Sequence, residues 1–131
     1  MIRKTKILVV DDERHIARFL EFVLKREGYD VAVAHDGDHA LATVRSFRPD
    51  AMVLDVVLPK QSGLEVLKSV RSDPVHAHIK VLVLTAKSFE EGLEKMQQAG
   101  ANSLCSKPIA PSVLLKTLSE LGAAPKTEDT D

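Results

Sequence analysis

The sequence has little of what marks secreted, membrane or nucleic-acid-binding proteins. It contains a single cysteine, Cys105, which excludes an internal disulfide framework, and the apolar neighbours of this residue favour a buried thiol over a redox sensor. It has no apolar run long enough to span a bilayer and no secretory-type stretch at its N-terminus. Its net charge of -1 provides no basic field for nucleic acid or anionic lipid. We therefore expect a cytoplasmic protein that contacts neither a membrane nor nucleic acid directly.

What the sequence does contain is the composition of an ordinary globular protein and a repeating pattern of short apolar segments. Its 131 residues are enough for one domain with a sizeable core. Five aliphatic runs predict strands, at residues 7–10, 31–34, 51–57, 81–84 and 103–106. Between and after these runs, apolar residues repeat at the spacing of one helix face, as in Ile16, Leu20, Val23 and Leu24.

Strands that alternate with helices predict a parallel sheet that is covered by helices on both faces. We expect an α/β fold of the doubly wound, flavodoxin-like (βα)5 type, a five-stranded parallel sheet in the order 2-1-3-4-5. The folded domain is expected to span residues 1–121. The stretch 122–131 loses the apolar periodicity and gains small, polar and acidic residues, so it is predicted to be a flexible tail or the start of a linker.

Five polar residues stand at the ends of the predicted strands or within them. The first strand ends in Asp11 and Asp12, and the third contains Asp55. The fourth strand ends in Thr85 and the fifth in Lys107. Ligands of open α/β sheets bind outside the carboxyl ends of the strands, and strands 1 and 3 are neighbours in the expected order. The sequence therefore predicts one pocket that contains three carboxylates, a hydroxyl and an ammonium.

The carboxylates predict a metal site. Two like charges about 4 Å apart near a protein surface repel by roughly 4 kcal/mol, and a lone aspartate in the apolar run around Asp55 would be costly to ionise. A hard divalent cation such as Mg²⁺ would neutralise Asp11, Asp12 and Asp55 together. The alternatives are a turn or capping role for Asp55, an N-cap role for Asp12 and a plain surface position for Asp11.

Lys107 and Thr85 extend the prediction from metal binding to phosphate chemistry. A lysine ammonium pairs with phosphate oxygens as a point charge, and a threonine hydroxyl can donate to another phosphate oxygen. A carboxylate nucleophile, Mg²⁺, an ammonium and a hydroxyl are the parts needed for phosphoryl transfer, and the predicted product is an aspartyl phosphate at Asp55.

Two histidines, His76 and His78, form a second group of possible metal ligands. They lie on one side of an expected loop, but no third ligand follows them. This segment is therefore predicted to be a solvated loop.

From residue 6 to residue 121 the chain resembles the receiver domain of two-component response regulators. The motifs that carry the resemblance are "ILVVDDE", "PDAMVLDVVLPKQSGLEVL", "VLVLTA" and "GANSLCSKPIAPSVLL", in this order and at the spacing of the family. The resemblance implies that Asp55 accepts phosphate from a histidine kinase or a histidine phosphotransfer protein. It implies that Asp11, Asp12, Asp55 and the backbone carbonyl of Val57 hold Mg²⁺. It also implies that Thr85 and Lys107 contact the phosphoryl group and that the Lys107-Pro108 bond is cis.

The chain departs from the family pattern near its fifth strand. Leu104 stands where family members usually have a Tyr or Phe that moves inward on phosphorylation. The acidic pair that commonly precedes this aromatic residue is replaced by Asn102 and Ser103, and Ile109 stands where Phe is frequent. The resemblance implies a switch of the face formed by helix 4, strand 5 and helix 5. It leaves open whether the output is a separate protein or a covalently linked output domain.

Two other classes of function fit the pattern less well. A phosphohydrolase of the haloacid dehalogenase type would carry a D-x-D motif after the first strand, where this chain has adjacent aspartates, Asp11 and Asp12. A nucleotide-binding protein would need a Gly-rich or Ser/Thr-rich loop there, and "DDERHIA" is neither. We expect the chain to act as a switch and not as an enzyme, apart from its own phosphorylation and dephosphorylation.

Overall fold

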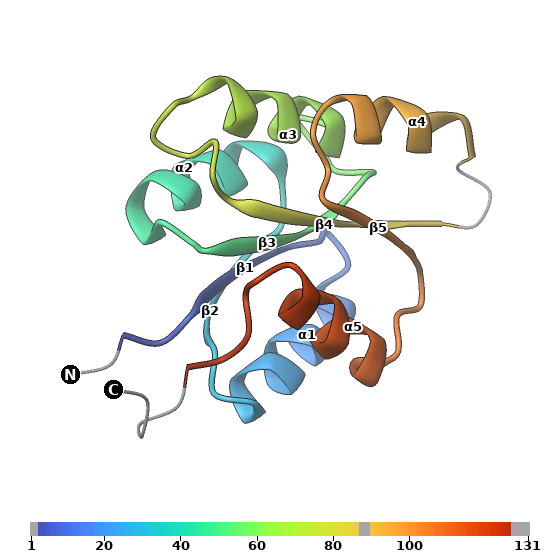
Figure 1. The fold of residues 1–131 in the computed structure, drawn as a ribbon. Coiled ribbons are helices and arrows are strands. Elements are labelled where there is room, and N and C mark those ends of the chain that lie inside the picture. The colour runs from blue at the N-terminus through green and yellow to red at the C-terminus, as the bar shows by residue number, and fades with distance from the viewer. Residues whose placement is uncertain (1–2, 87–89, 127–131) are drawn as a thin grey trace.

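The computed structural model describes residues 3–86 and 90–126. Five strands form one parallel sheet in the order β2-β1-β3-β4-β5, which confirms the predicted fold (Figure 1). The strands are β1 (Lys6–Val10), β2 (Asp30–Ala34), β3 (Ala51–Asp55), β4 (Lys80–Thr85) and β5 (Ser103–Ser106). None of the helices in the described ranges is both long and apolar enough to cross a membrane.

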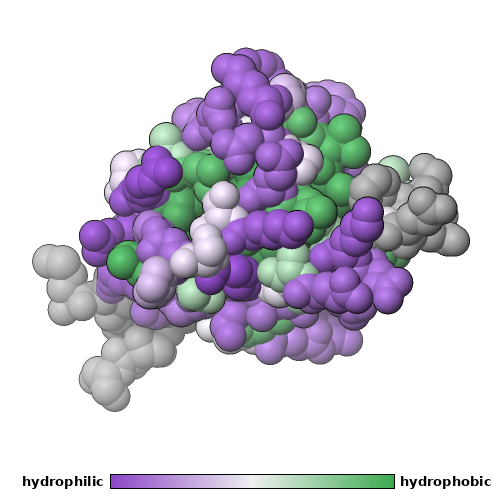
Figure 2. All heavy atoms as spheres, turned by 90° about the horizontal axis from the view of Figure 1, so that it is seen from above, coloured by the Kyte–Doolittle hydropathy of each residue, from purple (hydrophilic) through white to green (hydrophobic). Residues whose placement is uncertain are grey.

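Helices cover both faces of the sheet. They are α1 (Arg14–Arg26), α2 (Gly37–Phe47), α3 (Gly63–Ser72), α4 (Glu90–Gln98) and α5 (Pro111–Glu120). In Figure 1, α1 and α5 lie on one side of the sheet, and α2, α3 and α4 lie on the other. Figure 2 looks onto the layer of three helices and shows mostly hydrophilic side chains with smaller apolar areas between them.

The core consists of two apolar clusters, one on each face of the sheet. In β1, Ile7 and Val9 belong to the cluster under α1 and α5, whereas Leu8 and Val10 belong to the cluster under α2, α3 and α4. Successive side chains of a strand point to opposite faces, so a central parallel strand is buried on both. This explains why β1 and β3 are continuous aliphatic runs and do not alternate apolar with polar residues.

The third strand ends two residues earlier than predicted, at Asp55. The apolar run continues through Val56 and Val57, but the chain turns here because the amide of Gly63 donates to the carbonyl of Val56 at 2.8 Å. A Cβ atom on Gly63 would overlap the Asp55 carbonyl oxygen and lie 2.9 Å from the Val56 Cα. The absence of a side chain at residue 63 therefore allows α3 to begin directly beside the end of β3.

The chain remains packed beyond α5. The hydroxyl of Tyr29 donates to the carbonyl of Ala123 at 2.6 Å, and the hydroxyl of Thr5 donates to the carbonyl of Ala124 at 2.8 Å. Ala123 is only 3% exposed, and burial, with a contribution from Glu27, raises the pKa of Tyr29 to about 12. Contacts with the domain thus continue beyond residue 121, where we expect the domain to end. Residues 127–131 of the expected tail lie outside the described residues.

The loop before β4 differs from the solvated loop predicted around His76. His76 is buried, and its Nδ1 lies 2.9 Å from a carboxylate oxygen of Asp73. His78 is exposed, as predicted. The prediction is wrong for His76 because the short turn from Asp73 folds the imidazole back against the domain.

Candidate phosphoacceptor and metal site

Three carboxylates converge at the carboxyl edge of the sheet. Asp11 and Asp12 directly follow β1, and Asp55 is the last residue of the neighbouring strand β3. One oxygen from each of these carboxylates lies within 4.8 Å of the others. Asp11 and Asp55 are buried, 1% and 6% exposed, whereas Asp12 is exposed. The structure therefore brings together the three acidic residues that the sequence placed at this edge.

Lys107 supplies the positive charge at this cluster. Its Nζ lies 2.9 Å from Asp55 Oδ2 and 3.0 Å from Asp11 Oδ2. The backbone amide of Lys107, one residue past β5, donates to the carbonyl of Thr85 at 2.8 Å, which fixes the lysine beside β4. The Lys107-Pro108 bond is cis, as the resemblance to receiver domains implies. One ammonium is thus shared by two buried carboxylates from different strands.

The pKa values of Asp55 and Lys107 reflect their burial and the charges around them. Burial raises the pKa of Asp55, the charge of Asp11 raises it further, and the hydrogen bond from Lys107 opposes both without cancelling them. Burial alone would lower the pKa of Lys107, but its bonds to Asp55 and Asp11 outweigh this and raise it. The ammonium therefore stays charged at neutral pH and favours the ionised, nucleophilic form of Asp55.

One buried oxygen at the site lacks a hydrogen bond. Asp11 Oδ1 accepts from the amide of Glu13 at 2.9 Å, whereas Asp11 Oδ2 has no hydrogen bond within the described residues and only the ion pair with Lys107 Nζ at 3.0 Å. A buried carboxylate oxygen with an ion pair but no hydrogen bond, in a cluster with two further carboxylates, matches the all-oxygen ligand sets of hard divalent cations. The residues present therefore fit a metal ion.

The other predicted site residues lie beside the cluster. Thr85 ends β4 and is buried, and its hydroxyl donates to the carbonyl of Ala86 at 3.1 Å. Val57 lies two residues past Asp55, its side chain is 67% exposed, and its amide approaches Asp55 Oδ1 at 3.3 Å. The N-cap of α1 is Glu13, so the alternative that Asp12 caps this helix is wrong.

Glu13 is a member of the cluster that the sequence reasoning missed. Its Oε1 lies 3.4 Å from Lys107 Nζ, so it is a third carboxylate around the ammonium. The signal was available, because Glu13 directly follows the aspartate pair in "DDE". Its half-exposed side chain makes the pair with Lys107 weak compared with the two buried ones.

Comparison with known proteins gives a consistent result. The model of the response regulator receiver domain matches residues 7–119. The chain is 43% identical over 106 residues to the alkaline phosphatase synthesis transcriptional regulatory protein PhoP of Bacillus subtilis, covering 81% of this chain and 43% of that protein. It is 38% identical over 112 residues to the DNA-binding response regulator MtrA of Mycobacterium tuberculosis, covering 86% of this chain and 48% of that protein. The chain thus spans about half the length of these curated relatives.

Solved structures agree with the sequence relatives. The chemotaxis response regulator CheY4 of Vibrio cholerae superposes with a TM-score of 0.85 at 34% identity, covering 91% of this chain and 99% of that chain. A putative response regulator from Chloroflexus aurantiacus superposes with a TM-score of 0.86, also at 34% identity, covering 91% of this chain and 98% of that chain. From the fold, the carboxylate cluster and these relatives together, we conclude that the chain belongs to the receiver domains of two-component response regulators.

Proposed function

We propose that this receiver domain is a phosphorylation switch in which Asp55 accepts a phosphoryl group from a histidine kinase or a histidine phosphotransfer protein. The observation that carries the proposal is the buried Asp55 carboxylate, which shares the Lys107 ammonium with Asp11 at the carboxyl edge of the sheet. A carboxylate oxygen attacks the phosphorus, the new P–O bond forms as the P–N bond to histidine breaks, and the histidine nitrogen leaves with the electron pair.

Asp11, Asp12, Asp55 and the backbone carbonyl of Val57 would hold Mg²⁺. When bound, the ion supplies charge neutralisation between the carboxylates and the incoming phosphoryl oxygens. Asp11 Oδ2 and the exposed Asp12 support this assignment, because the first has no hydrogen bond to lose and the second keeps the site open to solvent.

Lys107 and Thr85 would contact the phosphoryl group after transfer. The Lys107 ammonium already lies at 2.9 Å from Asp55 Oδ2, so a phosphoryl group on Asp55 would come within its reach. The Thr85 hydroxyl would exchange its bond to the Ala86 carbonyl for a phosphoryl oxygen. This exchange couples the end of β4 to the charge on Asp55.

The phosphodonor would approach over the start of α1. A cavity of about 430 Å³ adjoins Lys107 there, and its lining includes Ile16, Leu20 and Ile109. Phe19 also lines this cavity and is half-exposed. Apolar surface beside a reactive carboxylate is suited to hold a partner protein while its histidine reaches Asp55.

The output would pass through the face of α4, β5 and α5. Leu104 on β5 is partly buried against the core cluster under α2, α3 and α4, so the signal would pass through repacking around an aliphatic side chain and not through an aromatic one. The receiving partner is a separate output protein or a covalently linked output domain. The curated relatives, whose names describe regulators of transcription or DNA binding, support the linked form, with DNA binding outside this domain.

Four further assignments complete the proposal. The receiver domain itself spans residues 1–121, and the residues after it form a tail or the start of a linker whose first part packs on the domain through Ala123 and Ala124. Direct contact with nucleic acid or membrane is not part of its role, and its compartment is the cytoplasm, consistent with the free thiol of Cys105. Catalysis is confined to its own phosphorylation and dephosphorylation.

Intact mass spectrometry tests the proposal. The protein is incubated with a small phosphodonor such as acetyl phosphate, with Mg²⁺ or with EDTA, alongside Asp55→Asn and the control Asp30→Asn, which changes an exposed aspartate at the start of β2. We expect one phosphoryl adduct in the wild type and in Asp30→Asn that requires Mg²⁺, and none in Asp55→Asn. An adduct that persists in Asp55→Asn would show that another residue is the acceptor.

A further inference from the structure

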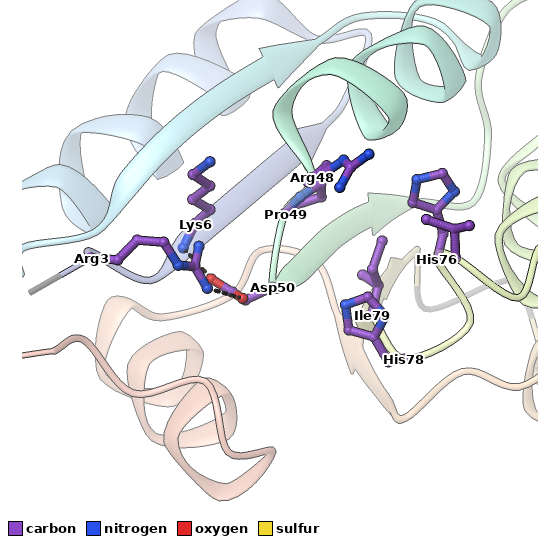
Figure 3. Close-up of a pocket in the computed structure, with 9 residues that line it drawn as sticks. Arg3, Lys6, Arg48, Pro49, Asp50, His76, His78 and Ile79 are labelled. Atoms are coloured by element: carbon purple, nitrogen blue, oxygen red, sulfur yellow. Dashed lines mark hydrogen bonds and ion pairs between the residues drawn. The ribbon is translucent and has the colours of Figure 1, made fainter.

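A second cavity lies at the amino edge of the sheet, opposite the carboxylate cluster. It has a volume of about 370 Å³, within the range of small-molecule sites. Figure 3 shows its lining, with Arg3, Lys6, Arg48 and Asp50 on one side and His76, His78 and Ile79 on the other. Three chain segments meet here: the segment that leads into β1, the loop between α2 and β3, and the loop between α3 and β4.

The charge of this cavity is positive. Its single carboxylate, Asp50, is fully used by its neighbours, because Oδ1 accepts from the Arg3 guanidinium at 3.0 Å and Oδ2 accepts from the Lys6 amide at 2.8 Å. Burial alone would raise the pKa of Asp50, but these two bonds, together with the charges of Arg3 and Lys126, outweigh it and lower the pKa. Asp50 thus compensates Arg3, and within residues 3–86 and 90–126 neither Lys6 nor Arg48 forms an ion pair with a carboxylate.

The two uncompensated cations are held in place by the fold. The Lys6 ammonium donates to the Phe47 carbonyl at 3.2 Å and stands 5.3 Å from the centre of the Phe47 ring, which leaves donors free for a ligand. Arg48 ends α2 in the left-handed conformation, at φ 52°, with its amide bonded to the Val44 carbonyl. Glycine or asparagine is the usual residue at such a position, so the fold keeps an arginine where backbone strain opposes it.

The opposite wall combines hydrogen-bonding groups with apolar surface. The imidazole of His76 is buried and oriented by Asp73, which lies 2.9 Å from its Nδ1, and the imidazole of His78 is exposed. Ile79 on this wall is buried, as is Pro49, which stands beside Arg48 (Figure 3), whereas Val75 of the same lining is 56% exposed and supplies apolar surface. Cations on one side and rings with aliphatic surface on the other are suited to an anion that carries an organic ring.

We propose that this cavity binds a small phosphate-bearing anion of about the size of a mononucleotide. The phosphate lies against Lys6 and Arg48, and the organic part lies over the exposed Val75 and the imidazoles. The site is separate from the phosphoacceptor site, because it is formed at the amino ends of β1, β3 and β4, whereas Asp11 and Asp55 stand at the carboxyl ends.

Nuclear magnetic resonance titration with adenosine monophosphate tests the proposal. The ¹⁵N-labelled protein is titrated in EDTA, so that metal-dependent binding at Asp55 is absent. We expect saturable shifts of the amides of residues 48, 50 and 76–80. We expect Arg48→Gln and Lys6→Gln each to weaken binding about tenfold, because each removes one charge-assisted contact. Arg18→Gln, which removes an exposed arginine of α1, should bind like the wild type.

Four results would overturn the assignment. The first is no saturable shift up to about 10 mM, a concentration that would detect even weak specific binding. The second is an equal loss in Arg18→Gln, which would indicate attraction by overall charge only. The third is shifts centred on the carboxylate cluster. The fourth is tighter binding of a short DNA duplex to the same residues, which would make the cavity part of a nucleic-acid surface. The amide spectrum of each variant shows whether it is folded.

Discussion

At the scale of single residues, the site depends on one ammonium shared among several carboxylates. Lys107 pairs with Asp11 and Asp55 in the interior and with Glu13 at the rim. Removing Lys107 would leave two buried carboxylates without their cation, a change that typically costs about 3–5 kcal/mol, whereas neutralising Asp55 leaves Lys107 paired with Asp11. Lys107 therefore has a structural task in the unphosphorylated protein in addition to its proposed contact with the phosphoryl group.

Asp55→Asn should make the metal-free protein more stable at pH 7. The pKa of Asp55 is raised in the folded state, chiefly by burial, so the stability that its protonated form provides is complete below the unfolded pKa. This stability is lost as the pH rises through the folded pKa. The neutral amide introduced by Asp55→Asn retains this stability at every pH. The stability difference between Asp55→Asn and the wild type should therefore shrink as the pH falls from 7 towards 4.

Urea unfolding in EDTA at several pH values measures this difference, with Asp30→Asn as the control for removing a surface carboxylate. A variant that is less stable than the wild type at pH 7 would mean that the bond to Lys107 outweighs the burial of Asp55.

The site residues that could be predicted from the sequence are those that stand at the ends of strands. Asp11, Asp12 and Asp55 are brought together because parallel neighbouring strands end at the same edge. The ion pair between Glu13 and Lys107 and the lack of a hydrogen bond at Asp11 Oδ2 depend on side-chain conformations, which the sequence pattern does not contain.

At the scale of elements, the turn from β3 into α3 sets the position of Asp55. Ser62 and Glu65 form a capping box that starts α3, and Gly63 lies against the end of β3. The sequence pattern extended β3 through Val57 because the apolar run does not stop at Asp55. The end of the strand depends on the packing of Gly63, and the apolar pattern of the sequence does not show this packing.

Gly63→Ala should destabilise the protein by about 1–3 kcal/mol, the usual cost of overpacking. At an ordinary helix position, alanine would instead stabilise relative to glycine by roughly 0.5–1 kcal/mol, so the sign of the effect is diagnostic. The expected loss arises because the added Cβ would overlap the Asp55 carbonyl oxygen.

Urea unfolding gives the stability change of Gly63→Ala. The rate of phosphorylation by acetyl phosphate shows whether displacing the end of β3 also slows phosphorylation of Asp55. A more stable variant with unchanged phosphorylation would show that the turn has room for a side chain.

At the scale of the whole molecule, the metal site should link ion binding to folding. A ligand that binds only the folded state at 100 times its Kd stabilises it by about 2.7 kcal/mol. For a domain of this size, this corresponds to a rise in Tm of roughly 10 °C. We expect saturating Mg²⁺ to produce such a rise, and Asp12→Asn to remove most of it.

Thermal unfolding followed by circular dichroism provides the measurement, with NaCl at matched ionic strength as the control for screening. Asp12 is exposed, so its substitution should leave the metal-free protein folded. Equal rises in the wild type and in Asp12→Asn would remove this residue from the proposed ligands.

The overall topology was the most predictable property of the chain. Buried parallel strands, helices of one-sided apolar character and short connections leave few ways to arrange five units, and the observed order is the expected one. The packing of residues 123 and 124 and the burial of His76 were not predicted, because both follow from contacts with distant segments or tight turns. Small and polar residues in those stretches look like solvent-exposed chain when considered alone.

The bonds from Tyr29 and Thr5 to residues 123 and 124 fix the direction in which the chain leaves the sheet. Both donors stand just before the first residues of β2 and β1, so residues 123 and 124 lie at the amino edge, across the sheet from Asp55. Any module joined beyond Pro125 would start on that far side. A phosphodonor and an attached module could therefore occupy the domain at the same time, and neither would have to leave for the other to act.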